Sequence, residues 1–371
     1  MKKNIVLIGN SSWSILKFRS GLIKRFIMLN YNVIVIAPLD EHTLDIKKLG
    51  CEYNNIRIDK KGTNPVNDLI LIFQLRSIYK RLKPIFVIHY SIKPNIYGTI
   101  AAYLANIKSY AVVTGLGYTF INENITSKIT RILYKLAFKF PEKVFFLSED
   151  DKSTFILKNL VREDKVVMIP GEGINTDLFN SVDQENQQKG SKIKFLLIAR
   201  MLFDKGVREY VEASDILKVE FPEVEFGLLG YLDVENPTAV SKKQMKEWEL
   251  NNNIVFYGSS DNVKFFIQDS DCIVLPSYRE GLSMTLMEGA SMKKPLVASN
   301  VSGCRELIDD GINGYLCRKK DTKDLANKMR AMLNLSDERR KNMGLLGRAK
   351  MVEQFDEEIV INKYLSIINI E

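Results

Sequence analysis

Two cations that follow a predicted strand form the clearest candidate for a binding site in the sequence. The stretch ARMLFDKGV (199–207) comes after an apolar run, and it places Arg200 and Lys205 five positions apart, with Gly206 next to the lysine. A helix is predicted to begin just after the glycine, so its unpaired N–H groups would face the same turn. Arginine binds two oxygens of a phosphate at once, and lysine supplies a point charge. The pattern indicates a site for an anion such as a diphosphate, with solvated loop cations as the alternative.

Two glutamates in the stretch YREGLSMTLMEGA (278–290) suggest what lies beside that anion. We expect a helix to begin near Ser283, with Glu280 and Gly281 in the loop before it and Glu288 inside it. The first N–H groups of such a helix are unpaired and can bind phosphates. A carboxylate offers two acceptor oxygens, which suits two neighbouring sugar hydroxyls. Acids on both sides of a diphosphate site predict a nucleotide sugar, and a capped surface helix with an ordinary acid is the alternative.

Apolar strands alternate with helical stretches in both halves of the chain. The predicted strands are 4–9, 32–38, 53–58, 85–90, 109–115 and 143–150, then 193–200, 224–230, 253–258, 271–276 and 295–299. Continuous apolar runs between helices are typical of parallel sheets that are covered on both faces. We therefore predict two doubly wound, Rossmann-like α/β domains that face a cleft, with ligands beyond the carboxyl ends of the strands.

A polar, aperiodic stretch interrupts this alternation and marks a linker. The predicted organisation is an N-terminal domain over 1–178, a linker over 179–192 and a C-terminal domain over 193–353. The last segment, 354–371, is expected to form a helix that packs back on the N-terminal domain.

Composition limits the class of protein. The 371 residues are 46% hydrophobic and 26% charged, which is the balance of a soluble globular protein. A net charge of +8 favours anionic partners such as nucleic acid, phosphorylated ligands or an acidic membrane. Four cysteines and two histidines show no metal-ligand spacing, so we expect reduced, packed thiols and no metal site. No apolar run reaches the roughly 18 residues of a transmembrane helix, and the N-terminal run is too short for a signal peptide, which predicts a cytoplasmic protein.

Together the two motifs are more specific than either alone. The first motif is a strand followed by Arg, four residues, Lys–Gly and a helix. The second lies about 75 residues later and is a strand followed by Glu–Gly, six residues and Glu. This combination resembles the retaining glycosyltransferases of family 4, which have the GT-B fold. The resemblance covers essentially the whole chain. It includes IPGEGINTDLF (169–179), similar to the family's interdomain hinge, and VSGCRELIDDGINGYL (301–316), similar to its stretch after the acidic pair.

The resemblance implies a role for each residue of these motifs. Glu280 would contact the donor hexose, Glu288 would bind the ribose hydroxyls, and Arg200 with Lys205 would hold the diphosphate and stabilise the leaving nucleotide. The family usually needs no metal ion, which agrees with two basic residues in its place; no other cofactor is expected. The predicted donor-binding residues are Gly9, Arg200, Lys205, Glu280, Gly281, Leu282, Ser283, Met284, Thr285 and Glu288, and the predicted catalytic residues are Glu280, Arg200 and Lys205.

The N-terminal half is expected to bind the acceptor. Gly9, in a strand-to-helix turn, would allow the backbone to approach the donor phosphates. Many family members have a histidine in the loop that matches 112–120, where this chain has Thr114 and Gly115, and the glycines at 115 and 117 suit the close approach of a ligand. The predicted acceptor-binding residues are Arg19, His89, Lys93, Thr114 and Gly115, with Lys93 as a candidate for an acceptor phosphate; a structural role is the alternative for His89.

A basic amphipathic helix is predicted over 126–143. Its apolar residues follow helical spacing, and Lys128, Arg131, Lys135, Lys139 and Lys143 lie around the other side. Such a helix can bind an anionic membrane, or it can pack on the core with a solvated basic face.

The segments YSIKPNIYG and TGLGYTF resemble bacterial transferases that extend polyprenyl-diphosphate-linked sugars in O-antigen lipopolysaccharide, capsule or protein-glycosylation pathways. The resemblance therefore implies transfer of a hexosyl group from a UDP-sugar to a lipid-linked saccharide. The expected group is an N-acetylhexosamine, with N-acetylgalactosamine as one candidate. Such an enzyme would be peripheral on the cytoplasmic face of the inner membrane.

Two rival functions stay open from the sequence. A nucleotide-sugar 2-epimerase of the same fold would need acid–base residues in the cleft, and two histidines in the chain make this less favourable. A nucleic-acid-binding protein is suggested by the pI of about 9.0, but the basic residues are scattered among acids without an aromatic-rich patch. A dehydrogenase is disfavoured because GNSSWS, not G-x-G-x-x-G, follows the first strand.

Overall fold

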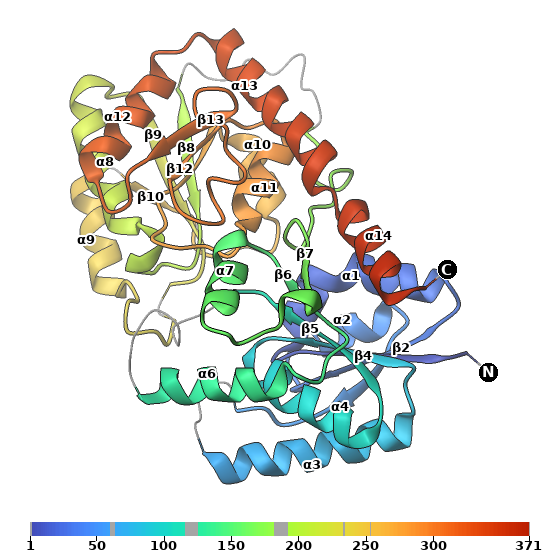
Figure 1. Cartoon of the computed structure of the whole chain (residues 1–371). Helices are drawn as coiled ribbons and strands as arrows, with labels where there is room; N and C mark the ends of the chain where they lie inside the picture. The colour runs from blue at the N-terminus through green and yellow to red at the C-terminus, as the bar shows by residue number, and fades with distance from the viewer. Residues whose placement is uncertain are drawn as a thin grey trace. The chain divides into compact units, whose positions relative to one another are not determined.

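The computed structural model describes residues 2–59, 64–115, 125–181, 192–232, 234–252 and 254–370 (Figure 1). They form two compact units, of which the first contains Met1–Gly173 and Glu357–Glu371 and the second Ile174–Asp356. The division thus falls at residue 173 rather than at the expected 178. Most of the expected linker, residues 182–191, lies outside the described residues.

The first unit is built on a seven-stranded sheet in which every neighbouring pair is parallel, in the order β3-β2-β1-β4-β5-β6-β7. Its strands are β1 (Asn4–Ile8), β2 (Asn32–Ala37), β3 (Glu52–Asn55), β4 (Phe86–Tyr90), β5 (Lys108–Val113), β6 (Lys143–Phe146) and β7 (Val166–Met168). The chain order reverses between β1 and β4, which makes the carboxyl ends of these strands the topological switch point of the sheet.

Helices cover both faces of this sheet. One face packs against α3 (Pro65–Leu82), the π-helical turn η1 (Pro94–Gly98), α4 (Thr99–Ala105), α6 (Ile125–Ala137) and α7 (Glu149–Leu157). The other face packs against α1 (Ser12–Met28), α2 (Thr43–Lys48) and α14 (Glu357–Ile368). The C-terminal helix α14 therefore belongs to the core of the first unit, where Tyr364 lies with its ring centroid 4.7 Å from that of Phe145.

The second unit repeats the architecture with a six-stranded sheet, again parallel, in the order β10-β9-β8-β11-β12-β13. The strands are β8 (Lys194–Ile198), β9 (Glu225–Leu229), β10 (Ile254–Phe256), β11 (Cys272–Leu275), β12 (Leu296–Ser299) and β13 (Gly314–Cys317). Residues of α8 (Val207–Glu220), α9 (Lys242–Asn252), α12 (Thr322–Leu333) and α13 (Asp337–Lys350) cover one face. The other face is covered by α10 (Val263–Asp269), α11 (Met284–Ser291) and the π-helical turn η4 (Met351–Phe355). The predicted pair of doubly wound parallel domains is confirmed.

Helix α6 packs on the sheet through a face that contains only part of its apolar residues. Its buried residues are Ser127, Thr130, Tyr134 and Ala137, and Tyr134 contacts the core rings of Phe138 and Phe155. The apolar side chains of Ile125, Ile129, Ile132 and Leu136 are 48–77% exposed.

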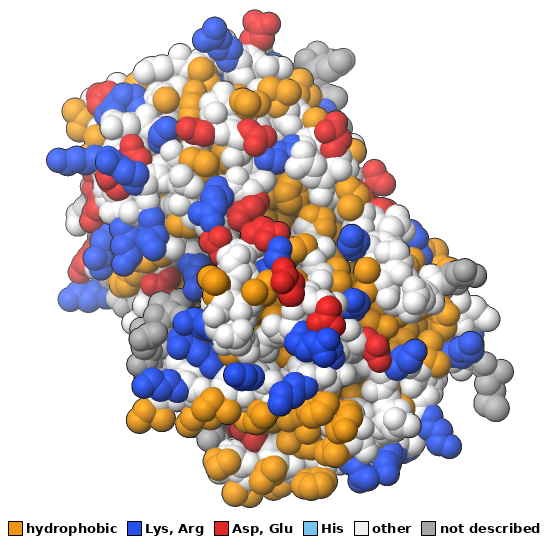
Figure 2. Space-filling view, viewed as in Figure 1, with side chains coloured by type: hydrophobic (Ala, Val, Ile, Leu, Met, Phe, Trp, Pro, Cys, Tyr) orange, Lys and Arg blue, Asp and Glu red, His pale blue; other side chains and the backbone are white. Residues whose placement is uncertain are grey.

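Figure 2 shows a band of hydrophobic side chains over α3 and α6 with Lys and Arg residues beside it. On α3 the exposed apolar residues are Val66, Leu69, Ile70 and Phe73. We define these four residues together with Ile125, Ile129, Ile132 and Leu136 as the apolar face. In the described part of the chain no helix is long and apolar enough to cross a membrane.

Candidate active site

The second unit places the two sequence motifs at its own switch point. Strands β8 and β11 are neighbours, and the loop after β8 carries Arg200 and Lys205 while the loop after β11 carries Glu280. The Lys205 Nζ lies 2.6 Å from Glu280 Oε1, and the two side chains are 21% and 12% exposed. Arg200 is exposed, and its side chain has no hydrogen bond or ion pair with the residues that the structure describes. A partly buried ion pair and an exposed arginine thus both lie in loops that follow the two central strands of the sheet.

Gly206 allows the loop after β8 to pack closely against the loop after β11. It precedes α8 with φ 72°, and a Cβ at this position would lie 2.1 Å from the carbonyl oxygen of Pro276. The neighbouring Asp204 carbonyl accepts a hydrogen bond of 2.8 Å from the Tyr278 N–H. The loop after β8 therefore docks on the loop after β11 through backbone atoms, and only glycine combines this φ with so close an approach.

The start of α11 is the candidate phosphate site. The helix begins at Met284, and the Ser283 hydroxyl caps it by accepting from the Leu286 N–H at 3.3 Å. The prediction that the Ser283 N–H is unpaired is wrong, because this group donates to the Gly303 carbonyl at 3.1 Å. Among the described residues the N–H groups of Leu282, Met284 and Thr285 have no hydrogen-bond partner.

A further hydrogen bond ties the start of this helix to the sheet. The Thr285 hydroxyl donates to the carbonyl of Ile198, the last residue of β8, at 3.2 Å, which ties α11 to the central strand. Glu288 lies in the second turn of α11 and is only 4% exposed. The helix start is therefore held by β8, and Glu288 is buried one turn further along the same helix.

Gly303 is a site residue that sequence reasoning missed. Its φ is 80°, and a Cβ here would lie 2.3 Å from the Gly281 carbonyl oxygen and 2.8 Å from Glu280 Cβ. Its N–H donates to Glu306 Oε2 at 2.7 Å. The segment 301–308 therefore supports the loop that carries Glu280. The V-S-G-C sequence at its start was the available signal, since glycine after a strand often marks a close backbone approach.

His89 is buried and does not face a position where a ligand could bind. It lies in β4 with no exposed surface, between the Tyr79 hydroxyl at 3.1 Å from Nε2 and the Thr99 hydroxyl at 3.4 Å from Nδ1. Gly98 leaves room for the ring, because a Cβ there would lie 2.5 Å from His89 Cδ2. Burial lowers the pKa of His89 to about 3, which keeps the ring neutral. This placement corrects the predicted acceptor contact, because β4 is a central strand covered on both faces.

Arg19 is likewise buried rather than available to an acceptor. Its guanidinium forms an ion pair with Glu172 and lies 4.1 Å from the ring centroid of Tyr90. The side chains of Arg19 and Glu172 are 5% and 10% exposed. The predicted acceptor contact of Arg19 is therefore corrected too, because its side chain is buried and paired with Glu172.

The other predicted residues of the first unit lie at strand ends. Gly9 is buried after β1, and a Cβ there would lie 2.9 Å from Ile15 Cδ1, so the glycine lets α1 close over the strand. Thr114 and Gly115 follow β5 and are half-buried. Gly115 has φ 143° and no atom within 4 Å of a Cβ position, so open space adjoins it. The neighbouring Gly117 lies outside the described residues.

Lys93 follows β4 and is paired rather than free. Its Nζ lies 2.6 Å from Asp68 Oδ1, and the Tyr97 hydroxyl donates to the other oxygen of Asp68 at 2.6 Å. No group of three or more His, Cys, Asp or Glu residues that could hold a metal ion occurs within the described ranges.

Comparison with known proteins places this geometry in a family. The family model "Glycosyl transferase 4-like" matches residues 4–148, and "Glycosyl transferases group 1" matches residues 179–350. The N,N'-diacetylbacillosaminyl-diphospho-undecaprenol alpha-1,3-N-acetylgalactosaminyltransferase of Campylobacter jejuni is 31% identical over 98% of this chain and 97% of its own length. The chain belongs to the family 4 glycosyltransferases.

A second relative is also a glycosyltransferase, and two solved structures share the fold. The capsular polysaccharide biosynthesis glycosyltransferase CapM of Staphylococcus aureus is 23% identical over 88% of this chain and 87% of its own. A glycosyltransferase of Rickettsia africae shares the fold with a TM-score of 0.80 over the full length of both chains at 21% identity. Anabaena HepE, solved with UDP and glucose, also has a TM-score of 0.80, over 99% of both chains at 15% identity. The glycosyltransferase therefore has the predicted GT-B fold.

Proposed function

We propose that this glycosyltransferase moves an N-acetylhexosaminyl group from a UDP-sugar to a polyprenyl-diphosphate-linked saccharide, with retention of the anomeric configuration. The end-to-end match to the C. jejuni relative, whose name gives a diphospho-undecaprenol-linked acceptor and N-acetylgalactosamine transfer, carries the proposal. A relative in Escherichia coli, 25% identical over 78% of this chain, is named as an alpha-1,3-galactosyltransferase acting on GlcNAc-diphosphoundecaprenol. Two relatives thus share the class of acceptor and differ in the sugar.

The switch point of the second unit fits the donor half of this reaction. The ammonium group of a lysine has three N–H donors. Lys205 donates one of them to Glu280, so the other two are available for a diphosphate oxygen. The exposed Arg200 and the N–H groups of Met284 and Thr285 supply further donors for the same anion. The second oxygen of Glu280 would accept from a hydroxyl of the donor sugar, and Glu288 would bind the ribose hydroxyls.

The proposed chemistry needs no covalent intermediate. The bond from the anomeric carbon to the β-phosphate oxygen breaks while the acceptor hydroxyl oxygen bonds to the same face of that carbon. The acceptor proton passes to the departing phosphate oxygen. Arg200, Lys205 and the start of α11 stabilise the negative charge that develops on the diphosphate, which is the electrostatic role that a divalent cation has in other transferases.

The experiment that tests the function is a transfer assay with the full-length enzyme. UDP-activated N-acetylgalactosamine, N-acetylglucosamine, galactose and glucose would each be incubated with a polyprenyl-diphosphate-linked amino sugar, with and without EDTA. We expect one N-acetylhexosamine to be added, in the α configuration of the donor by NMR, at an unchanged rate in EDTA. Product with inverted configuration, or release of an epimerised sugar without acceptor, would contradict the proposal.

We also propose that the apolar face lies on the cytoplasmic surface of the inner membrane, where a lipid-linked acceptor would be held. The sequence of α6 contains no acidic residue, and exposed Lys128 and Lys135, with Lys139 just after the helix, lie near its apolar residues. An apolar helix side with neighbouring cations is the composition that binds anionic bilayers. Peripheral attachment through this face would bring the enzyme to its acceptor.

The membrane proposal predicts the behaviour of a single variant. Replacing Ile132, which is 60% exposed, with aspartate should weaken binding to vesicles of phosphatidylglycerol and phosphatidylethanolamine by about tenfold or more, because it removes an apolar side chain that the bilayer would bury and adds a negative charge. Co-sedimentation measures the effect. Val219→Asp, at an apolar position of α8 that is 85% exposed and lies outside the apolar face, is the control and should bind as the wild type does. Equal binding of all three proteins would rule out α6 as the contact.

A further inference from the structure

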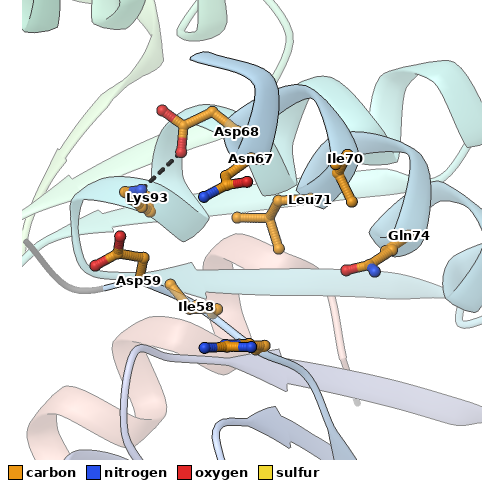
Figure 3. A pocket seen from close by; sticks show the side chains of 9 residues that line it. Ile58, Asp59, Asn67, Asp68, Ile70, Leu71, Gln74 and Lys93 are labelled. Atoms are coloured by element: carbon orange, nitrogen blue, oxygen red, sulfur yellow. Dashed lines mark hydrogen bonds and ion pairs between the residues drawn. The ribbon is translucent and has the colours of Figure 1, made fainter. Parts of the chain in front are cut away.

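A cavity of about 620 Å³ lies in the first unit beyond the carboxyl ends of β3 and β4 (Figure 3). It is lined by residues 57–59 after β3, by the first half of α3 and by Lys93 after β4. Its volume falls in the range of roughly 300–1,000 Å³ that is usual for small-molecule sites. Its position, at the strand ends of a parallel sheet, is where such folds bind ligands.

Among the lining residues that the structure describes, the charges are balanced. They include two cations, Arg57 and Lys93, and two carboxylates, Asp59 and Asp68. Lys93 and Asp68 hold each other at 2.6 Å, and their side chains are only 15% and 11% exposed. A phosphate would have to compete with the buried carboxylate of Asp68 for this ammonium group. The interpretation of Lys93 as a residue that binds an acceptor phosphate is therefore not favoured, and a neutral polar ligand fits better.

The side chains of α3 supply the contacts that a sugar needs. Asn67, Leu71 and Gln74 follow one another at helical spacing on one side of α3, and Figure 3 shows them on the side toward Ile58 and Asp59. Asn67 and Gln74 are exposed, and within the described residues neither side-chain amide has a hydrogen-bond partner. An amide both donates and accepts, as sugar hydroxyls and N-acetyl groups do. Leu71 and Ile58 add a buried apolar surface for the C–H groups of a pyranose ring.

We propose that this cavity binds a sugar residue of the acceptor, with Asn67 and Gln74 as the residues that select it. Ile70 lines the cavity and is also part of the apolar face, so one lipid-linked saccharide could place its sugar in the cavity and its lipid chain on that face, with the diphosphate that joins them outside the cavity. This inference rests on the proposed function, from which the lipid-linked nature of the acceptor is taken. It adds a location and a recognition chemistry for the saccharide.

The first test measures saccharide binding without any transfer. Saturation-transfer NMR would be recorded on the full-length protein with methyl α-glycosides of N-acetylgalactosamine, N-acetylglucosamine, galactose and glucose. We expect signals for at least one glycoside, lost in the Asn67→Ala/Gln74→Ala variant and kept in Ser77→Ala, an exposed position of α3 outside the cavity. No signal from any glycoside, or signals that survive in the double variant, would overturn the proposal. Displacement of the glycoside by inorganic pyrophosphate would also overturn it, in favour of a phosphate site.

The second test uses the transfer reaction. In the double variant the KM for the lipid-linked acceptor should rise about tenfold or more, because two hydrogen bonds to the sugar are lost, while the KM for the UDP-sugar stays as in the wild type. An unchanged acceptor KM would count against the cavity. If no transfer occurs with any donor, the proposed function fails, and the NMR result still decides whether the cavity binds a saccharide.

Discussion

Replacing Lys205 with alanine is expected to lower kcat for sugar transfer by about 10²–10³-fold, the usual cost of removing one preorganised group that stabilises developing charge. The ammonium lies 2.6 Å from Glu280 Oε1, and the Lys205 side chain is only 21% exposed, so water replaces it poorly. Under the proposed function its loss would remove a positive charge from the leaving diphosphate, and it leaves the partly buried carboxylate of Glu280 without this partner. The affinity for UDP, measured by calorimetry, should fall in the same variant.

The control for this prediction is Lys243→Ala, an exposed lysine of α9 that should transfer sugar at the wild-type rate. A second comparison uses the pair itself. Because Lys205 and Glu280 are in contact, the effects of Lys205→Ala and Glu280→Gln should be non-additive in the double variant. A Lys205→Ala enzyme that retains kcat within about threefold of the wild type would remove this lysine from the site.

Replacing Arg19 with methionine is expected to lower the free energy of unfolding of the first unit by about 3–5 kcal/mol. Arg19 and Glu172 form a buried ion pair, and methionine would leave the carboxylate of Glu172 buried without a counter-charge. Burial already raises the pKa of Glu172 although Arg19 opposes this, so removal of the guanidinium should raise it further. The loss of stability should therefore shrink as pH falls and Glu172 becomes protonated, because protonation abolishes the unpaired charge.

Urea unfolding followed by tryptophan fluorescence measures this effect. The chain has two tryptophans, and in a Trp248→Phe background the remaining Trp13, in α1, reports on the first unit. Arg25→Met is the matched control, since Arg25 lies on the same helix and its ion pair with Glu358 is more exposed. It should cost less than about 1 kcal/mol. A similar small loss in Arg19→Met would show that the buried pair is not needed for stability.

Local patterns were enough to predict the elements and the two motifs. Continuous apolar runs predicted β8 and β11, and the residues after them, Lys205–Gly206 and Glu280–Gly281, marked the turns that lead to helices. Such features depend on neighbours within about ten residues, because strand burial, capping and glycine turns are local. The predicted start of α11 at Ser283 differs from the observed start at Met284 by one residue.

The sequence by itself thus determined that two doubly wound sheets form and that each motif lies beyond the end of a strand. Only the tertiary structure decided that Lys205 and Glu280 touch, that Gly303 pairs with Ser283, and that His89 is buried. It also decided that α6 packs through Tyr134 and leaves Ile125, Ile129, Ile132 and Leu136 exposed, where the apolar pattern alone left both a core-facing and a membrane-binding helix open. The physical reason is shared: these outcomes depend on which strands and helices become neighbours, and neighbours in a parallel sheet are separated by crossovers that no local pattern encodes.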